Sequence, residues 1–231
     1  MSELTGRAAV VTGASRGIGL AVATELERQG ARVVRAARSL EPSRTATRLD
    51  VRCDVTDPAQ VAELAESTER AFGAPALVVS SAGSFLLAPL EDATPEQFAA
   101  QLAANLSGPF LVARTFLPPM RASGGGRFIT IGSIADHHAF PANAAYGASK
   151  AGLRGLHEVL RQEYRGSGVL ITLVSPGPTD TAAWDPVDPD RREGFIPRAK
   201  MLRTQDVAEA VAWVARRPSH VDVDWVRLGP A

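Results

Sequence analysis

Short apolar runs alternate with amphipathic stretches along nearly the whole chain, and this alternation constrains the fold more than any other feature of the sequence. A short apolar run bounded by turn residues is typical of a buried strand, and the stretch after it is long enough for a crossover helix. We expect strands over residues 8–12, 32–36, 50–54, 76–80, 127–132, 170–174 and 224–228. We expect helices over residues 17–29, 58–72, 95–118, 144–164 and 204–216. The pattern predicts an α/β fold, a Rossmann-type doubly wound parallel sheet of about seven strands with helices on both faces.

Two stretches break this alternation within what we expect to be a single domain over residues 1–231, since the chain has 231 residues and is 45% hydrophobic. Residues 38–54 leave too little chain for a full crossover helix, so we expect a loop or one turn before the third strand. Residues 177–201 are rich in Pro, Asp and Arg and carry Trp184 and Phe195. Long irregular segments of compact domains are usually lids or binding loops, so we expect a substrate lid there.

Charge and cysteine content exclude several classes of function. Lys plus Arg and Asp plus Glu both number 25, and the basic residues are scattered, which favours a small-molecule ligand over nucleic acid or an anionic membrane. The lone Cys53 excludes an internal disulfide, and the four histidines do not match metal-ligand spacings, so we expect no metal site. No apolar run approaches the roughly 20 residues of a membrane span, and no leader pattern opens the chain. We therefore expect a cytoplasmic location.

A glycine-rich turn, Gly13-x-x-x-Gly17-x-Gly19, follows the first expected strand and opens the first expected helix. Glycines at these positions allow a tight turn, close approach of the backbone to a pyrophosphate and close helix packing, with the phosphate oxygens facing the helix amino terminus. The alternative is an ordinary glycine-rich turn between a strand and a helix. Its place after the first strand favours a dinucleotide site.

The end of the second expected strand indicates which dinucleotide binds. An acidic residue there would accept hydrogen bonds from an adenosine ribose and would repel a 2′-phosphate. The chain has Ala37 at this position, followed by Arg38, and Arg16 lies in the neighbouring turn. Two guanidinium groups could bind a 2′-phosphate with charge-assisted hydrogen bonds, so we predict NADP(H) over NAD(H). The alternative is that both arginines are solvated surface groups.

Tyr146 and Lys150 lie four residues apart in an expected helix, in a chain with only two tyrosines and two lysines. On one helix face the ammonium could stabilise a phenolate and lower the pKa of the tyrosine from its usual value of about 10, and it could also hydrogen-bond a ribose. Ser133 closes an apolar run thirteen residues before Tyr146. Its hydroxyl is expected at the carboxyl end of a central strand, where open α/β sheets bind ligands. Taken singly, each residue could instead be an ordinary helical or strand-end side chain.

With these three residues, the spacing of the glycine-rich turn resembles the short-chain dehydrogenase/reductase family, and the resemblance covers nearly the whole chain. Further matching segments are Cys53-Asp54-Val55, Ser80-Ser81-Ala82-Gly83, Asn105-Leu106-Ser107-Gly108 and Pro176-Gly177-x-x-x-Thr181. The resemblance implies an oxidoreductase that transfers a hydride between NADP(H) and a carbonyl or alcohol substrate. Ser133 would hydrogen-bond the carbonyl, Tyr146 would act as acid or base, and Lys150 would order the nicotinamide ribose. Asn105 would hold a water that relays protons to Lys150.

The same resemblance implies the members of the site. Asp54 and Val55 would hold the adenine, Ala82 and Gly83 would line the cofactor, and the segment from Pro176 would fix the nicotinamide. The expected catalytic residues are Asn105, Ser133, Tyr146 and Lys150. The expected cofactor-binding residues are Gly13, Ser15, Arg16, Gly17, Ile18, Gly19, Arg38, Asp54, Val55, Ser81, Ala82, Gly83, Tyr146, Lys150, Pro176, Gly177, Thr179 and Thr181. Because family members pair their helices between subunits, we expect a homodimer or homotetramer.

Two departures from the family pattern bear on function. Ser81 stands where the family usually has an asparagine, so this turn is expected to be held differently. The tail, residues 222–231, lacks the Gly-Gly ending of fatty-acid-synthesis reductases, which makes a 3-oxoacyl carrier-protein reductase an alternative rather than the favoured activity. A non-catalytic NADP(H) sensor or interaction protein is an alternative of another class. The substrate determinants are expected in residues 84–87 and 135–140 and at Trp184, Phe195 and Ile196; they are mostly apolar, with His137 and His138 expected to be solvated.

Overall fold

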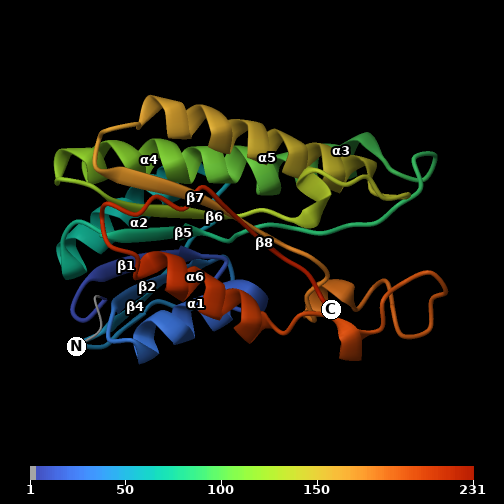
Figure 1. Cartoon of the computed structure of the whole chain (residues 1–231), viewed down its shortest axis with the longest axis horizontal. Helices are drawn as coiled ribbons and strands as arrows, with labels where there is room; N and C mark the ends of the chain where they lie inside the picture. The colour runs from blue at the N-terminus through green and yellow to red at the C-terminus, as the bar shows by residue number, and fades with distance from the viewer. Residues whose placement is uncertain (1–3) are drawn as a thin grey trace.

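The computed structural model describes residues 4–231, and within them eight strands form one sheet in the order β3-β4-β2-β1-β5-β6-β7-β8 (Figure 1). Seven strands are parallel, and only β3 at the edge is antiparallel, to β4. The strands are β1 (Ala8–Thr12), β2 (Arg32–Ala37), β3 (Ser43–Arg44), β4 (Arg48–Arg52), β5 (Leu77–Ser80), β6 (Gly126–Ile131), β7 (Val169–Pro176) and β8 (Trp225–Leu228). The predicted doubly wound parallel sheet is confirmed.

Helices cover both faces of this sheet. The α-helices are α1 (Gly17–Arg28), α2 (Pro58–Phe72), α3 (Pro95–Leu102), α4 (Gly108–Ala122), α5 (Ala144–Glu163) and α6 (Thr204–Ala215). The short helical segments are η1 (Ala103–Ser107), η2 (Ile134–Asp136), η3 (Ala182–Trp184) and η4 (Arg198–Lys200). In Figure 1, α1 and α6 lie together on one face, whereas α4 and α5 lie on the other.

Two hydrophobic cores result, one on each side of the sheet, because side chains of a strand point alternately to opposite faces. In β1, Val11 packs in the core beneath α1 and α6, and Val10 packs in the core beneath α2 and α4. Both valines are fully buried. A strand buried on both faces reads as a continuous apolar run, which explains why the sequence predicts the central strands well.

Two segments differ from the expected secondary structure. Residues 38–54 contain the two-residue strand β3, which pairs with β4 and places the Ser43 hydroxyl on the buried carboxylate of Asp50, 2.8 Å away. The helix expected over residues 95–118 is interrupted by the π-helical segment η1 and continues to residue 122. It continues past Pro118 and Pro119, and Leu117 and Met120 in its last turns are buried.

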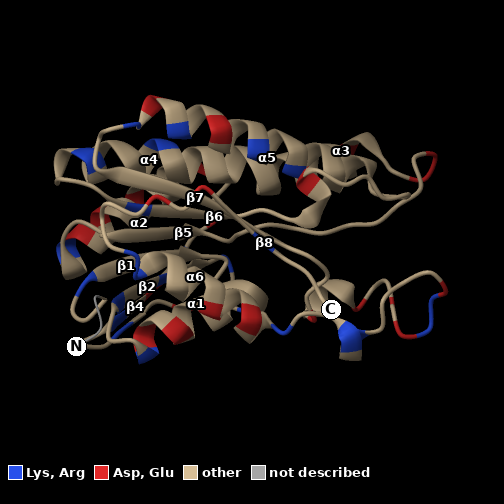
Figure 2. Cartoon of the chain, in the orientation of Figure 1, with Lys and Arg blue, Asp and Glu red and all other residues tan. Residues whose placement is uncertain are grey.

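Charged side chains are spread over the helical layers. Figure 2 shows Lys and Arg interspersed with Asp and Glu along the outer helices, without a large patch of one sign in this view. Among residues 4–231, no helix is long and apolar enough to cross a membrane. The same described residues contain no group of three or more His, Cys, Asp or Glu side chains arranged to hold a metal ion.

Candidate active site

The glycine-rich turn after β1 packs directly against the turn after β5. Gly13 has a φ of 69°, and a Cβ atom added to it would lie 2.8 Å from the Cα atom of Ala82. A Cβ on Gly19 would overlap the carbonyl oxygen of Gly13. Glycine is therefore required at both positions, and the first turn of α1 lies close to the end of β1.

Ser81 is held by a hydrogen bond from its backbone rather than by its side chain. The Oγ1 atom of Thr12 accepts from the backbone N–H groups of Ser81 and Ala82, at 3.1 and 3.2 Å. Gly83, next in this turn, lies against the amide oxygen of Asn105: a Cβ on Gly83 would be 2.8 Å from that oxygen. The turn after β5 thus joins the glycine-rich turn to η1.

The amino terminus of α1 is suited to an anion. Its N-cap residue, Arg16, makes no side-chain capping hydrogen bond, so the first N–H groups of the helix have no side-chain acceptor. Gly17 has a φ of 58°, and a Cβ there would meet only the Thr181 side chain, at 3.5 Å. Ser15 and Ile18 lie half-buried in the same turn. The uncapped helix end fits the diphosphate of a dinucleotide.

The residues expected around the adenosine lie at the carboxyl ends of β2 and β4. Ala37 ends β2 and is buried, and the next residue, Arg38, is exposed. Arg16 is also exposed, on the turn after the adjacent strand β1. The hydrogen bond from the Thr56 backbone lowers the pKa of Asp54, and the charge of Arg38 adds to this. Two exposed guanidinium groups therefore lie near the carboxyl ends of β1 and β2.

The carboxyl ends of the strands also carry Val55, after β4, and the segment from Pro176, after β7. Val55 is buried, and a Cβ on Gly108 would lie 2.8 Å from its Cγ2 atom. Pro176 ends β7, and the Gly177 N–H donates to the Leu228 carbonyl at 2.7 Å. Thr179 is also buried: its hydroxyl donates to the Gly177 carbonyl at 3.0 Å.

Ser133, Tyr146 and Lys150 come together beyond the carboxyl end of β6. Ser133 caps η2 by accepting a hydrogen bond from the Ala135 N–H at 3.2 Å. Lys150, on α5, is buried, and its Nζ atom donates to the Ile131 carbonyl at 3.0 Å and lies 5.7 Å from the ring centroid of Tyr146. The serine hydroxyl is close enough to Tyr146 to influence the pKa of its phenol. The structure therefore brings the three predicted residues together.

The electrostatics of this group differ from the sequence-based expectation. Burial raises the pKa of the Tyr146 phenol, a rise that the hydrogen bond with Ser133 opposes. Burial lowers the pKa of the Lys150 ammonium to about 8, while the charge of Asp136 acts in the opposite direction. The expectation that Lys150 lowers the pKa of Tyr146 is wrong in this structure, because loss of hydration outweighs the other influences on the phenol.

Asn105 lies in η1, where the helix widens into a π-helical turn, a feature found often at functional sites. It is buried, and its amide binds both backbone groups of Ser84: Oδ1 accepts from the N–H at 2.8 Å and Nδ2 donates to the carbonyl at 2.9 Å. Nδ2 also lies 3.0 Å from the Ser149 hydroxyl on α5. Asn105 thus fixes the segment after β5 against the helix that carries Tyr146 and Lys150.

A family model described as short chain dehydrogenase matches residues 7–192 of the chain. The chain belongs to the short-chain dehydrogenase family. Uncharacterized oxidoreductases of Staphylococcus aureus and Staphylococcus epidermidis are 34% and 32% identical to it, and each match covers 100% of both chains. Family membership makes this chain an oxidoreductase.

Solved structures of the family share its fold. A metagenomic short-chain oxidoreductase in complex with NADP is 31% identical, has a TM-score of 0.81 and covers 100% of this chain and 99% of its own. An alcohol dehydrogenase from the archaeon Thermococcus sibiricus, complexed with 5-hydroxy-NADP, is 25% identical, has a TM-score of 0.83 and covers 97% of both chains.

Sequence reasoning missed one charged residue of this short-chain dehydrogenase site. Asp136, three residues after Ser133, is buried, and its carboxylate accepts from the Ser175 hydroxyl and contacts the His137 imidazole. The indole N–H of Trp225 donates to the same Ser175 hydroxyl at 2.9 Å. His137 remains exposed, as expected, although one of its ring nitrogens contacts this network. No local pattern in the sequence identifies Asp136, because its partners come from β7 and β8.

Proposed function

We propose that this short-chain dehydrogenase is an NADP(H)-dependent carbonyl reductase, or the corresponding alcohol dehydrogenase, in which Tyr146 is the acid or base. The observation that carries the proposal is the convergence of Ser133, Tyr146 and Lys150 at the carboxyl end of β6, beside an uncapped helix terminus suited to a diphosphate. When bound, NADPH would supply the hydride for the carbonyl carbon.

The side chains of the chain handle the oxygen and its proton. The Ser133 hydroxyl holds the carbonyl oxygen, on which negative charge develops as the carbon is reduced. Tyr146 gives its phenolic proton to that oxygen, producing the alcohol and a phenolate. The Lys150 ammonium, 5.7 Å from the centre of the Tyr146 ring, would offset part of the burial penalty on the phenolate as it forms, and Asn105 would hold a water that relays protons to Lys150. Burial raises the pKa of the Tyr146 phenol, so near neutral pH the phenol carries the proton that reduction consumes.

The preference for NADP(H) over NAD(H) is supported by the end of β2. Ala37 offers no carboxylate there, and the exposed guanidinium groups of Arg38 and Arg16 can bind a 2′-phosphate. The two solved relatives described above were crystallised with NADP or 5-hydroxy-NADP. In this proposal Asp54 and Val55 hold the adenine.

The remaining parts of the proposal concern the lid and the assembly. The lid, residues 177–201, closes over the substrate, with Pro176, Gly177, Thr179 and Thr181 at the nicotinamide end.

The large apolar side chains of Phe98, Phe110 and Val159 are exposed on α3, α4 and α5. Covering these side chains in a homodimer or homotetramer would remove them from water, and light scattering tests that assembly.

The proposal is tested by following NADPH oxidation with a panel of aldehydes, ketones and oxo acids, and alcohol oxidation with NADP⁺. We expect turnover of at least one carbonyl, with kcat/KM at least tenfold higher for NADPH than for NADH. Arg38→Ala should raise the KM for NADPH about tenfold, as expected for one charge-assisted contact, and leave the KM for NADH unchanged. Arg121→Ala, on α4, is the matched control. Equal use of both cofactors would contradict the NADP(H) assignment, and NADPH binding without turnover of any substrate would indicate a sensor.

A further inference from the structure

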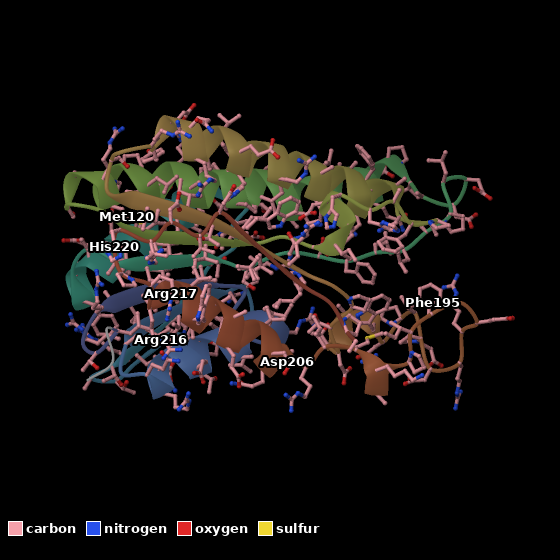
Figure 3. All side chains as sticks on the ribbon, in the orientation of Figure 1. Met120, Phe195, Asp206, Arg216, Arg217 and His220 are labelled. Carbon is pink, nitrogen blue, oxygen red and sulfur yellow. The ribbon has the colours of Figure 1, made fainter. Side chains whose placement is uncertain are left out.

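Three aromatic rings form a row in space that begins beside the phenol of Tyr146. The ring of Phe85, in the segment after β5, meets Tyr146 edge to face with 4.9 Å between centroids. The ring of Trp184, on η3 of the lid, also contacts Phe85, with 4.8 Å between centroids and an interplanar angle of 57°. Phe195 follows at 6.2 Å from Trp184. The rings come from three separate segments of chain, and Figure 3 places Phe195 on the loop that extends beyond the end of the sheet.

Arg198 binds the chain on both sides of Trp184. Arg198, on η4, donates to the Asp180 carboxylate at 2.8 Å and to the Thr181 carbonyl at 3.0 Å, both before Trp184 in the chain. The same guanidinium donates to the Asp185 carboxylate at 2.6 Å, directly after Trp184. Its backbone N–H also donates to Asp190 at 2.8 Å. The turn that carries the indole is therefore held from both sides.

The charged groups around the rings are directed at one another. The carboxylates of Asp180 and Asp185 both bind the Arg198 guanidinium. The Arg192 guanidinium lies 5.1 Å from the ring centroid of Phe195, on the outer part of the lid. The rings of Phe85 and Trp184 beside the Tyr146 phenol carry no charge, and the lid carboxylates nearest to them are paired with Arg198, which favours a neutral, apolar group on the substrate.

Resting on the proposed function, we propose that Phe85 and Trp184 form a binding surface for a planar aromatic group attached to the substrate carbonyl, and that Arg198 is the positioning residue for Trp184. A carbonyl oxygen bound by Tyr146 and Ser133 places its substituent next to the ring that touches Tyr146. Edge-to-face and offset-stacked pairs stabilise aromatic rings beyond the burial of their area. An aliphatic ring of similar size gains only from the area that it buries.

The test compares substrates that share a carbon skeleton: acetophenone against cyclohexyl methyl ketone, and benzaldehyde against cyclohexanecarbaldehyde, each with NADPH. The aryl-to-cyclohexyl ratio of kcat/KM is measured in the wild type and in variants, so that differences in intrinsic reactivity cancel. Trp184→Ala should lower the ratio about twofold to tenfold, the loss expected for one aromatic pair, whereas Trp184→Phe should keep most of it. Trp213→Ala, which removes an exposed indole on α6, should leave the ratio unchanged.

The positioning role of Arg198 is tested by the same assay, but here the expected change is in KM with kcat kept. Arg198→Ala should raise the KM for the aryl substrates several-fold and leave kcat within twofold, with faster proteolysis between residues 185 and 197. Arg198→Lys should restore only part of the KM, because an ammonium cannot reproduce the fork geometry that spans two carboxylates.

Two outcomes would overturn the inference in distinguishable ways. An unchanged ratio in Trp184→Ala and Phe85→Ala, with NADPH-dependent turnover intact, would refute the aromatic surface while leaving the proposed function standing. No NADPH binding and no turnover of any carbonyl in the panel would overturn both.

Discussion

The buried ammonium of Lys150 has a measurable consequence for stability. Burial lowers its pKa from 10.5 to about 8. At about 1.4 kcal/mol per pKa unit, this shift costs the folded state about 3 kcal/mol at any pH where the lysine is protonated in both states. The unfolded chain binds the extra proton between pH 8 and 10.5, so the stability of the wild type rises with pH across this window. Lys150→Met removes the titration altogether.

The assay is urea unfolding of the wild type and Lys150→Met at a series of pH values from 7 to 10.5. We expect the difference in unfolding free energy, variant minus wild type, to decrease by about 3 kcal/mol across this range. Other groups that titrate in the window are common to both proteins and cancel. Near pH 7 the loss of the hydrogen bond to Ile131, about 1.5–3 kcal/mol for a charged donor, offsets most of the variant's advantage. A difference that does not change with pH would refute the reasoning.

Three further predictions follow from other buried groups. Asp136→Asn removes a charge that raises the pKa of Lys150, so the alkaline limb of the pH profile of kcat should move to lower pH; an unshifted limb would contradict this. Gly19→Ala should lower the melting temperature and abolish NADPH binding, because the added Cβ would overlap a backbone oxygen, whereas Gly147→Ala, with open space in α5, should stabilise the protein by up to about 1 kcal/mol. Similar effects of the two substitutions would argue against the close packing of the glycine-rich turn. Asp50→Asn should lower the free energy of unfolding in urea by about 3–5 kcal/mol, because it breaks the largely buried ion pair of Asp50 with Arg35 of β2. A loss below 1 kcal/mol would contradict a stabilising role for this ion pair.

Much of the fold could be predicted because its signals are local. Strands such as β1 are buried on both faces and read as continuous apolar runs, and the glycines of the first turn reflect close contacts that exclude a Cβ. The grouping of Ser133, Tyr146 and Lys150 follows from the strand end and helix face on which they lie. The interruption at η1 has no local signal in the sequence, and the partners of its Asn105, Ser84 and Ser149, lie in distant segments of the chain.

The residues that sequence reasoning missed are identified by contacts that exist only in the folded chain. Asp136 is recognised only when β7 and β8 bring Ser175 and Trp225 beside it. In the sequence nothing distinguishes Arg198 from the other arginines of its segment, and only the fold of the lid brings the carboxylates of Asp180 and Asp185 to it. The direction of the pKa shift of Tyr146 cannot be predicted from the sequence, which shows a neighbouring charge but not the extent of burial.

The kinetics of Tyr146→Phe test the central claim most directly, since this variant removes only the phenolic oxygen. NADPH oxidation is followed with the best carbonyl of the panel, and NADPH binding is measured in parallel by fluorescence. We predict that kcat falls by about 100-fold to 10,000-fold, the range for loss of a general acid, while the Kd for NADPH stays within twofold. A kcat within tenfold of the wild type would contradict the assignment of Tyr146 as the proton donor.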